Sequence, residues 1–292
     1  MICSCLSGQD FDIISALTKD SVMKAPIKER IIVLQYKLLA DEAYRKICDA
    51  LSVFLAKDLA DELFVEERMN LPSVTLPAAT LGSIEPDWAQ LKISIDRPSR
   101  FWNHDKTKCI QFYREYLTVN LIDDLEGRVV GSYEGLCEFF VRLLPFFKSV
   151  NADLHVRRAG IDYQNILIGD QLVDFVKQDG GFLEVADIFR NDIVNVKISG
   201  ARAQTPFRFE TSYGQDPKQT TRFPALLRVT INVPNRSKSG WQVYVLFSAS
   251  ADFPGFVEDC IVEFLNDMHA SVIAGFMTTF SDKIVSRAVV KQ

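Results

Sequence analysis

The sequence predicts an α+β fold in which antiparallel strands form a sheet that curves around a long C-terminal helix. Three observations indicate this class. Apolar residues keep helical spacing from Val257 to Ile284, which predicts one long helix with a continuous buried stripe. Segments such as LKISID, at 91–96, alternate apolar and polar residues as half-buried strands do. The order strand, helix, several strands, helix occurs twice, which indicates two similar halves.

The chain divides into an extension and one domain. Residues 1–24 show no sustained period and are predicted to be an N-terminal extension. A chain of 292 residues is long for one core and short for three, so residues 25–292 are predicted to form a single α+β domain. The alternative division is into two closely packed halves, 25–150 and 151–292.

The remaining elements follow from the same two periodicities. In the first half these are a strand at 25–36, a helix from 41 to about 68, a strand at 91–96, a polar loop or hairpin end at 97–108, two strand segments at 109–123, and a helix at 132–149 with Ser132 at its N-cap. In the second half they are a short helix at 171–177 and strands at 182–188, 193–200, 205–213, 222–233 and 241–250. The two helices of the first half are expected to cover the faces of the sheet that the C-terminal helix leaves.

One predicted strand, DLHVRRAGIDYQNILI at 153–168, is interrupted by polar residues. In a strand Tyr163 and Asn165 share one face, while Asp162 points to the other. Gly160 permits a β-bulge that shifts the register, so a bent strand with one wet face explains the interruption. The alternative is that these polar groups form a site.

The candidate ligand-binding residues are Arg157, Tyr163, Asn165 and His269. A buried Tyr163 needs a partner for its hydroxyl and Asn165 can pair with backbone groups, so a structural polar network is the first interpretation. The alternative is a polar pocket that binds an anionic group. His269 is expected on the inner side of the last helix, either as a neutral, hydrogen-bonded histidine or as a base that faces the sheet.

A second candidate is a basic patch with one aromatic residue. It consists of Arg222, Arg228, Arg236, Lys238 and Trp241. Such a patch can bind acidic proteins or nucleic acid. The other interpretation is a solvated hairpin tip.

Composition and charge argue against several partners. The 33 Lys and Arg and 38 Asp and Glu residues give a net charge of −5, so the chain lacks the general attraction to phosphate that nucleic-acid-binding proteins carry. Its longest apolar runs fall short of the roughly 20 residues that a membrane span needs. Its start lacks the basic region of a secretory signal, so a cytoplasmic protein without a membrane or nucleic-acid partner is predicted.

No motif in the chain assigns a reaction. The sequence contains no Walker loop, no GxSxG and no GxGxxG. Its 3 histidines and 6 cysteines stand at scattered positions without the spacing of metal ligands. We therefore assign no catalytic residue, and we predict neither a metal nor a cofactor.

Four segments occur in an order that is similar to a known family. KAPIKERIIVLQY at 24–36 resembles an opening Pro-Ile-x-Glu strand, QFYREYLTVN at 111–120 a hairpin, AGIDYQN at 159–165 a Leu-Gly-Leu-Arg-Tyr-Ile-Asn strand, and 267–282 a closing helix in which His precedes Phe by seven positions. Together they resemble a sporadically distributed bacterial family of unknown function. The resemblance implies an α+β fold and accessory genes, including those of defence or toxin–antitoxin modules. Asp162 stands where that family usually carries Arg, which reverses the charge at that point.

Two functional hypotheses follow. The first is a non-enzymatic protein-interaction or regulatory component of a bacterial defence or toxin–antitoxin module, because no catalytic motif is assembled. Its expected partner is another protein or a second copy of the chain. The second hypothesis is a small-ligand-binding or hydrolytic protein with a cavity between the C-terminal helix and the sheet. A filled interior favours the first, and a polar cavity open to solvent favours the second.

Overall fold

The computed structural model describes residues 27–68, 71–75, 92–96, 98–122, 132–168, 189–190, 207–213, 222–223, 225–233, 242–282 and 285. The first half contains β1 (Ile27–Gln35), α2 (Asp41–Asp58), the short 3-10 helix η1 (Ala60–Glu62), β2 (Val65–Arg68), β3 (Leu71–Thr75), β4 (Lys92–Asp96), β5 (Ser99–Trp102), β6 (Lys108–Phe112), β7 (Tyr116–Ile122) and α3 (Tyr133–Leu154). The second half contains β8 (Arg158–Ile168), β9 (Phe207–Tyr213), β10 (Leu226–Val233), β11 (Gln242–Asp252) and α7 (Glu258–Thr279).

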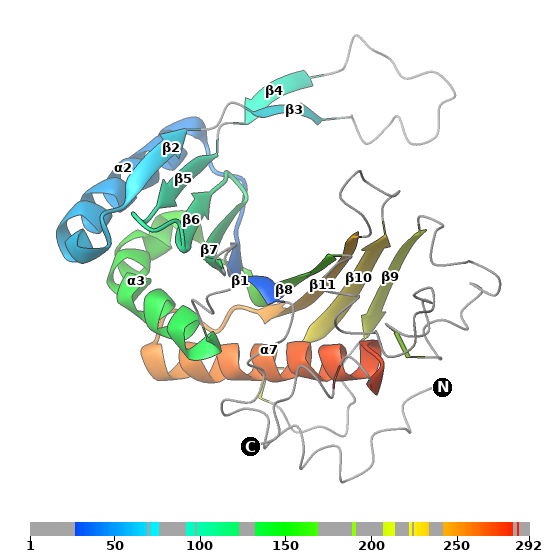
Figure 1. Ribbon diagram of the computed structural model, residues 1–292. Helices are drawn as coiled ribbons and strands as arrows, with labels where there is room; N and C mark the ends of the chain where they lie inside the picture. Colours follow the sequence, from blue (N-terminus) through cyan, green and yellow to red (C-terminus); the bar gives the residue numbers. More distant parts are fainter. Residues whose placement is uncertain are drawn as a thin grey trace.

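The main feature is one antiparallel sheet of nine strands in the order β2-β5-β6-β7-β1-β8-β11-β10-β9 (Figure 1). In each half the first strand, β1 or β8, lies at the centre of the sheet. The next strand in the sequence lies at the outer edge, and the strands after it follow in order back towards the centre. The two central strands, β1 and β8, pair with each other and join the halves. Strands β3 and β4 form a separate two-stranded sheet. The predicted α+β class, with an antiparallel sheet and a long C-terminal helix packed on it, is confirmed.

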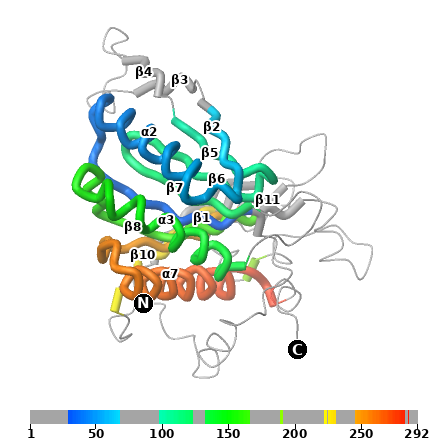
Figure 2. The backbone as a smooth tube through the Cα atoms, turned by 90° about the vertical axis from the view of Figure 1, so that its left-hand side faces the viewer, coloured from blue at the N-terminus to red at the C-terminus, as the bar shows by residue number. Residues whose placement is uncertain are grey.

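The long helices form one layer on one side of the sheet. Helix α3 lies between the other two, since it contacts both α2 and α7 (Figure 2). Below this layer α3 packs on β1 and β7, while α7 packs on β8, β10 and β11. The first-half helices therefore share a face with α7 and leave the other face without a described helix, which differs from the expectation that they cover the remaining faces. The cause is the alternation of side chains along each strand, which places the large apolar residues of neighbouring strands on one face of the sheet.

The interior between helices and sheet is filled by apolar side chains. The largest of the almost fully buried side chains are phenylalanines, namely Phe101, Phe112, Phe139, Phe140, Phe147, Phe189, Phe247, Phe264 and Phe280. From α7, Met268, Val272 and Phe276 complete the stripe that the sequence predicts. By length and composition α7 could cross a membrane, a test that the core helix of a soluble protein also passes.

Three element boundaries differ from the sequence prediction. Helix α2 ends at Asp58, and Leu63 takes a left-handed conformation (φ 51°) that turns the chain into edge strand β2. The predicted loop at 97–108 contains strand β5, which pairs with β2 and β6. Helix α7 ends at Thr279, because Phe280 adopts an extended conformation and bridges to Phe189.

The predicted bulge at Gly160 is wrong. Strand β8 pairs with β11 in continuous register from Arg158 to Ile168, and the irregularity lies in β1, between Ile27 and Glu29. Glycine is needed at position 160 for another reason, because a Cβ there would stand 2.3 Å from the Ala249 carbonyl oxygen. The predicted elements at 171–177, 182–188 and 193–200, and the extension at 1–24, lie outside the described residues.

Candidate functional site

The interrupted strand of the sequence is the central strand β8, and its polar residues point to two sides. Tyr163 and Asn165 lie on the helix side, where both side chains are buried. Asp162 lies on the other side, opposite Ser248 of β11. The sequence correctly predicted this alternation, and it separates two different polar environments within one strand.

On the helix side Tyr163 is paired with His269 of α7. The Tyr163 hydroxyl lies 2.7 Å from Nδ1 of His269. Burial lowers the pKa of His269 to about 4, and burial also raises the pKa of the Tyr163 hydroxyl. Both groups are therefore neutral near pH 7, and one hydrogen bond satisfies them without a charge. A histidine with so low a pKa is a weak base, which fits a structural role better than proton abstraction.

Two further side chains hold this pair in position. The Tyr133 ring stacks on the His269 ring with centroids 3.9 Å apart and planes 5° apart. Its hydroxyl donates to Oδ1 of Asn266, one turn before His269 on α7, at 2.8 Å. On the sheet side the buried Arg30 guanidinium lies 5.9 Å from the centroid of the Tyr163 ring. The cluster thus joins α3, α7, β1 and β8 through aromatic stacking and hydrogen bonds.

The other two candidate ligand-binding residues differ from each other. Nδ2 of Asn165 donates to the carbonyl oxygens of Tyr163 and Val245, both at 3.3 Å, while its Oδ1 is buried without a hydrogen-bond partner among the described residues. Arg157 is exposed just before β8, where its backbone N–H donates to Gln35. Six residues of extended chain separate it from Tyr163, a span of about 20 Å. The structure therefore brings Tyr163, His269 and Asn165 close together and leaves Arg157 apart.

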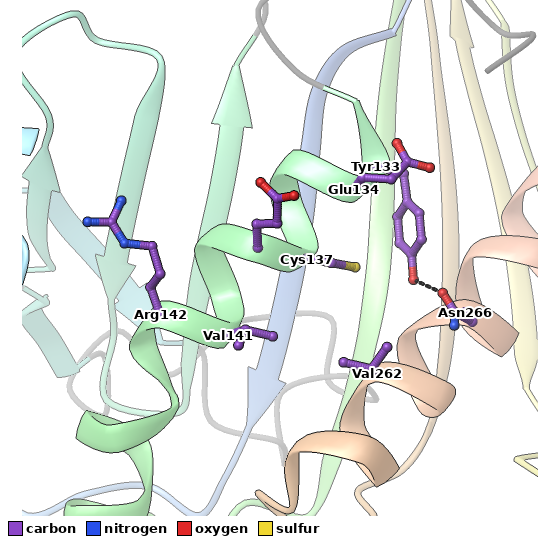
Figure 3. A pocket seen from close by; sticks show the side chains of 8 residues that line it. Tyr133, Glu134, Cys137, Val141, Arg142, Val262 and Asn266 are labelled. Atoms are coloured by element: carbon purple, nitrogen blue, oxygen red, sulfur yellow. Dashed lines mark hydrogen bonds between the residues drawn. The ribbon is translucent and has the colours of Figure 1, made fainter. Parts of the chain in front are cut away.

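Next to this cluster a groove of about 600 Å³ runs between α3 and α7 (Figure 3). We call it the α3–α7 groove. Its lining residues are Tyr133, Glu134, Cys137, Glu138, Val141, Arg142, Val262 and Asn266. The side chains of Val141 and Val262 face each other across it. Burial raises the pKa of the Cys137 thiol to about 11, so this thiol is protonated and contributes apolar surface.

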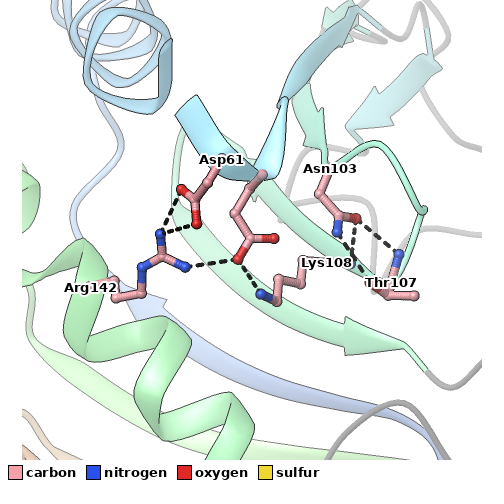
Figure 4. A network of polar contacts seen from close by, with 6 residues as sticks. Asp61, Asn103, Thr107, Lys108 and Arg142 are labelled. Atoms are coloured by element: carbon pink, nitrogen blue, oxygen red, sulfur yellow. Dashed lines mark hydrogen bonds and ion pairs between the residues drawn. The ribbon is translucent and has the colours of Figure 1, made fainter. Parts of the chain in front are cut away.

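The charged residues of the groove leave it with an acidic rim. The charge of Arg142 is already paired, because its guanidinium donates to Asp61 at 2.8 Å and to Glu62 at 2.8 Å (Figure 4). Lys108 also contacts Glu62. By contrast, Glu134 and Glu138 are exposed and form no ion pair with another described residue. The unbalanced charge along the groove is therefore negative.

The predicted basic patch is described only in part. The Arg222 guanidinium pairs with Glu263 of α7, on the helix side. Arg228 belongs to β10, opposite Ser248 and on the side of the sheet that faces away from the three long helices. The two described arginines therefore lie on different sides of the sheet. Arg236, Lys238 and Trp241 lie outside the described residues.

Sequence reasoning identified His269 and Tyr163 but missed Tyr133, Asn266 and the α3–α7 groove. A signal was present, since Tyr133, Cys137 and Val141 recur every four positions and form a stripe beside the core face of α3. Within the described ranges, no three His, Cys, Asp or Glu residues are grouped so that they could hold a metal ion.

Comparison with known proteins finds no family model and no curated protein sequence that matches the chain. The resemblance to the sporadic bacterial family therefore remains a prediction from the four segments described above.

Proposed function

We propose that the protein is a non-enzymatic interaction or regulatory component that binds a protein partner in the α3–α7 groove. The observation that carries this proposal is the combination of an apolar floor with an acidic rim on the surface of the helix layer. Grooves between packed helices are a common docking place for partner segments with apolar anchor residues.

The chemistry of the groove specifies the partner. Val141, Val262 and the buried Cys137 thiol suit an apolar anchor such as a leucine or phenylalanine side chain. Glu134 and Glu138 favour lysine or arginine next to that anchor, because complementary rim charges increase the association rate and specificity. The proposed occupant is therefore a basic, amphipathic segment of another protein.

The alternative, a ligand-binding or hydrolytic protein with a cavity between the C-terminal helix and the sheet, has less support. The space between α7 and the sheet is occupied by buried side chains, with the rings of Phe247 and Phe276 6.0 Å apart. His269, which could act as a base there, is held by Tyr163 and Tyr133 and has a low pKa. We further propose, from the family resemblance alone, a cytoplasmic role in a bacterial defence or toxin–antitoxin module.

Affinity capture with matched variants tests the groove. The wild-type chain and Val141→Glu are each used as bait in a lysate of the source organism, and captured proteins are identified by mass spectrometry. Val53→Glu is the control, because Val53 is 68% exposed on α2 and lies outside the groove. A protein that the wild type and Val53→Glu capture, and that Val141→Glu does not, is then purified and titrated against the chain.

The titration decides between the outcomes. We expect direct binding whose affinity falls as the salt concentration rises. Glu138→Lys should have a lower affinity than the wild type and a weaker dependence on salt. Equal binding by Val141→Glu and wild type would contradict the proposal. A purified chain that dimerises alone, with Val141→Glu monomeric, would assign the groove to a second copy and would equally overturn it.

A further inference from the structure

The face of the sheet opposite the three long helices has a hollow of its own, independent of the proposed function. It measures about 210 Å³ and lies over the central strands β1, β8, β11 and β10. We call it the sheet pocket. Its polar lining residues are Gln35, Arg158, Asp162, Arg228, Ser248 and Ser250.

The hollow exists because the row of side chains across the sheet is interrupted at Gly160. This residue stands between Val33 on β1 and Ser250 on β11. Any Cβ at Gly160 would lie 2.3 Å from the Ala249 carbonyl oxygen and 2.8 Å from Cβ of Ser250, so the close approach of β8 and β11 requires glycine. Backbone therefore forms the floor, and Arg158 and Asp162, two positions away on either side, stand at its two ends.

The charges in the sheet pocket do not cancel. Burial raises the pKa of Asp162 to about 6, although a hydrogen bond with Ser248 and the charge of Arg228 act in the opposite direction. Asp162 thus has one cation, Arg228, beside it. Arg158 is a second cation, and among the described residues its Nη2 donates to the Ser250 carbonyl and hydroxyl oxygens, at 3.4 and 3.2 Å. No described carboxylate forms an ion pair with Arg158.

We propose that the sheet pocket binds a small molecule that carries an anionic group, a phosphate or a carboxylate, with Arg158 as its charge partner. The planar guanidinium fork can donate two parallel hydrogen bonds to such a group, and the Ser250 hydroxyl, which accepts from Arg158, can donate a further one. The volume equals that of about seven water molecules, so the pocket takes a compact anion or one end of a larger metabolite. Asp162 lies at the other end of the pocket from Arg158 and can bind a hydroxyl or amino group of the same ligand.

Thermal melting of the purified full chain tests this site with two probes, inorganic phosphate and succinate. Sodium chloride at equal ionic strength is the reference. For the wild type we expect a rise in Tm of about 2–4 °C at tenfold above Kd. Phosphate also stabilises proteins without binding, so the decisive quantity is the difference between variants. Arg158→Gln should lose the specific part of the rise, and Arg157→Gln, the exposed neighbour, should keep it.

Asp162→Asn gives an independent arm, because loss of a nearby negative charge should strengthen binding of either probe several-fold. Circular dichroism confirms that each variant is folded, and Arg158→Lys, which keeps the charge, replaces Arg158→Gln if the latter is not. An equal response of wild type and Arg158→Gln would overturn the proposal, as would weaker binding by Asp162→Asn. A response to an oligonucleotide alone would overturn the assignment to a small molecule.

Discussion

Polar groups on the two sides of strand β8 lie in different environments. On the helix side Tyr163 is buried, and its hydroxyl is paired with a neutral His269 under a stacked Tyr133. On the other side Asp162 borders a pocket that holds two arginines and a floor without side chains. The difference teaches that one strand can supply a packed polar network and a binding surface at once, because successive residues point to different sides.

Burial acts on both sides in the same sense. It lowers the pKa of His269 and raises the pKa of Asp162, so each group is pushed towards its neutral form. On the pocket side the cation Arg228 opposes this effect for Asp162, and on the helix side Glu134 opposes it for His269. Tyr163 and His269 are neutral near pH 7 next to the buried cation Arg30, whereas the sheet pocket is lined by two arginines and one carboxyl group.

The largest effect is expected where the helix side is most tightly packed. Phe276→Ala should lower the free energy of unfolding by about 3–5 kcal/mol, because the ring is 4% exposed and packs against Phe247 and Phe280. Chemical denaturation measures the change. Val257→Ala, at a position that is 65% exposed, is the control and should change little. Similar stabilities for the two variants would show that the helix side is not the packed one.

A smaller loss is expected at the floor of the sheet pocket. Gly160→Ala should destabilise by about 1–3 kcal/mol, because the new methyl group collides with backbone atoms of β11 and the strands must separate. Gly135→Ala is the matched control in α3, where a Cβ meets no atom closer than 3.8 Å. If denaturation gives Gly160→Ala the stability of the wild type, the pocket floor is not a site of close strand approach.

The pH dependence of stability distinguishes the two sides. The folded pKa of His269, about 4, lies below its ordinary value of 6.5, so the unfolded chain binds more protons between these values. This group's contribution is fully present above pH 6.5 and is lost as the pH falls towards 4. Asp162 has a raised folded pKa and acts oppositely, since its contribution is present at low pH and is lost as the pH rises towards 6.

The wild type and His269→Gln share Asp162, so their stability difference isolates the histidine. We expect the difference to shrink by about 1–2 kcal/mol between pH 7 and pH 4, once the partial exposure of the ring is allowed for. A difference for His269→Gln that stays constant with pH would mean that His269 is not held neutral by burial.

The smallest effect is expected at the surface network that restrains Arg142. Arg142→Gln removes ion pairs with Asp61 and Glu62. Asp61 keeps access to water and Glu62 keeps its ion pair with Lys108, so the loss should be about 0.5–1 kcal/mol. The same change makes the rim of the α3–α7 groove more acidic and should tighten binding of a basic segment. Arg45→Gln, exposed on α2, serves as the control in both measurements.

The local parts of this structure were predictable from sequence. Ser132 caps α3 as expected, since its hydroxyl accepts from Gly135, and the helical spacing of Phe264, Met268 and Phe276 identified the buried stripe of α7. The boundaries between elements were less predictable. Residues 59–68 continue a helical pattern, yet Leu63 turns the chain so that β2 can pair with β5. Tertiary pairing outweighed local propensity there.

The site itself depends on contacts between distant parts of the chain. Tyr163 and His269 are 106 positions apart, and Tyr133 and Asn266 are 133 positions apart. Periodicity could place each residue on the inner or outer side of its own helix or strand. It carries no information on which helices lie next to each other, so the α3–α7 groove and the Tyr133 stacking could not be derived from it.

The seam between β1 and β8 has a consequence for how the chain folds during synthesis. Within the sheet, every strand pairing of the first half except the one with β8 is complete once α3 has emerged, so that half can assemble while the rest is still being made. Until β8 arrives, β1 is an open edge strand, and the backbone groups that later pair with β8 have no strand beside them. Such an edge is a template for pairing with another chain. Nascent or truncated chains that end after α3 are therefore expected to associate through β1, and arrival of β8 is the step that ends this hazard.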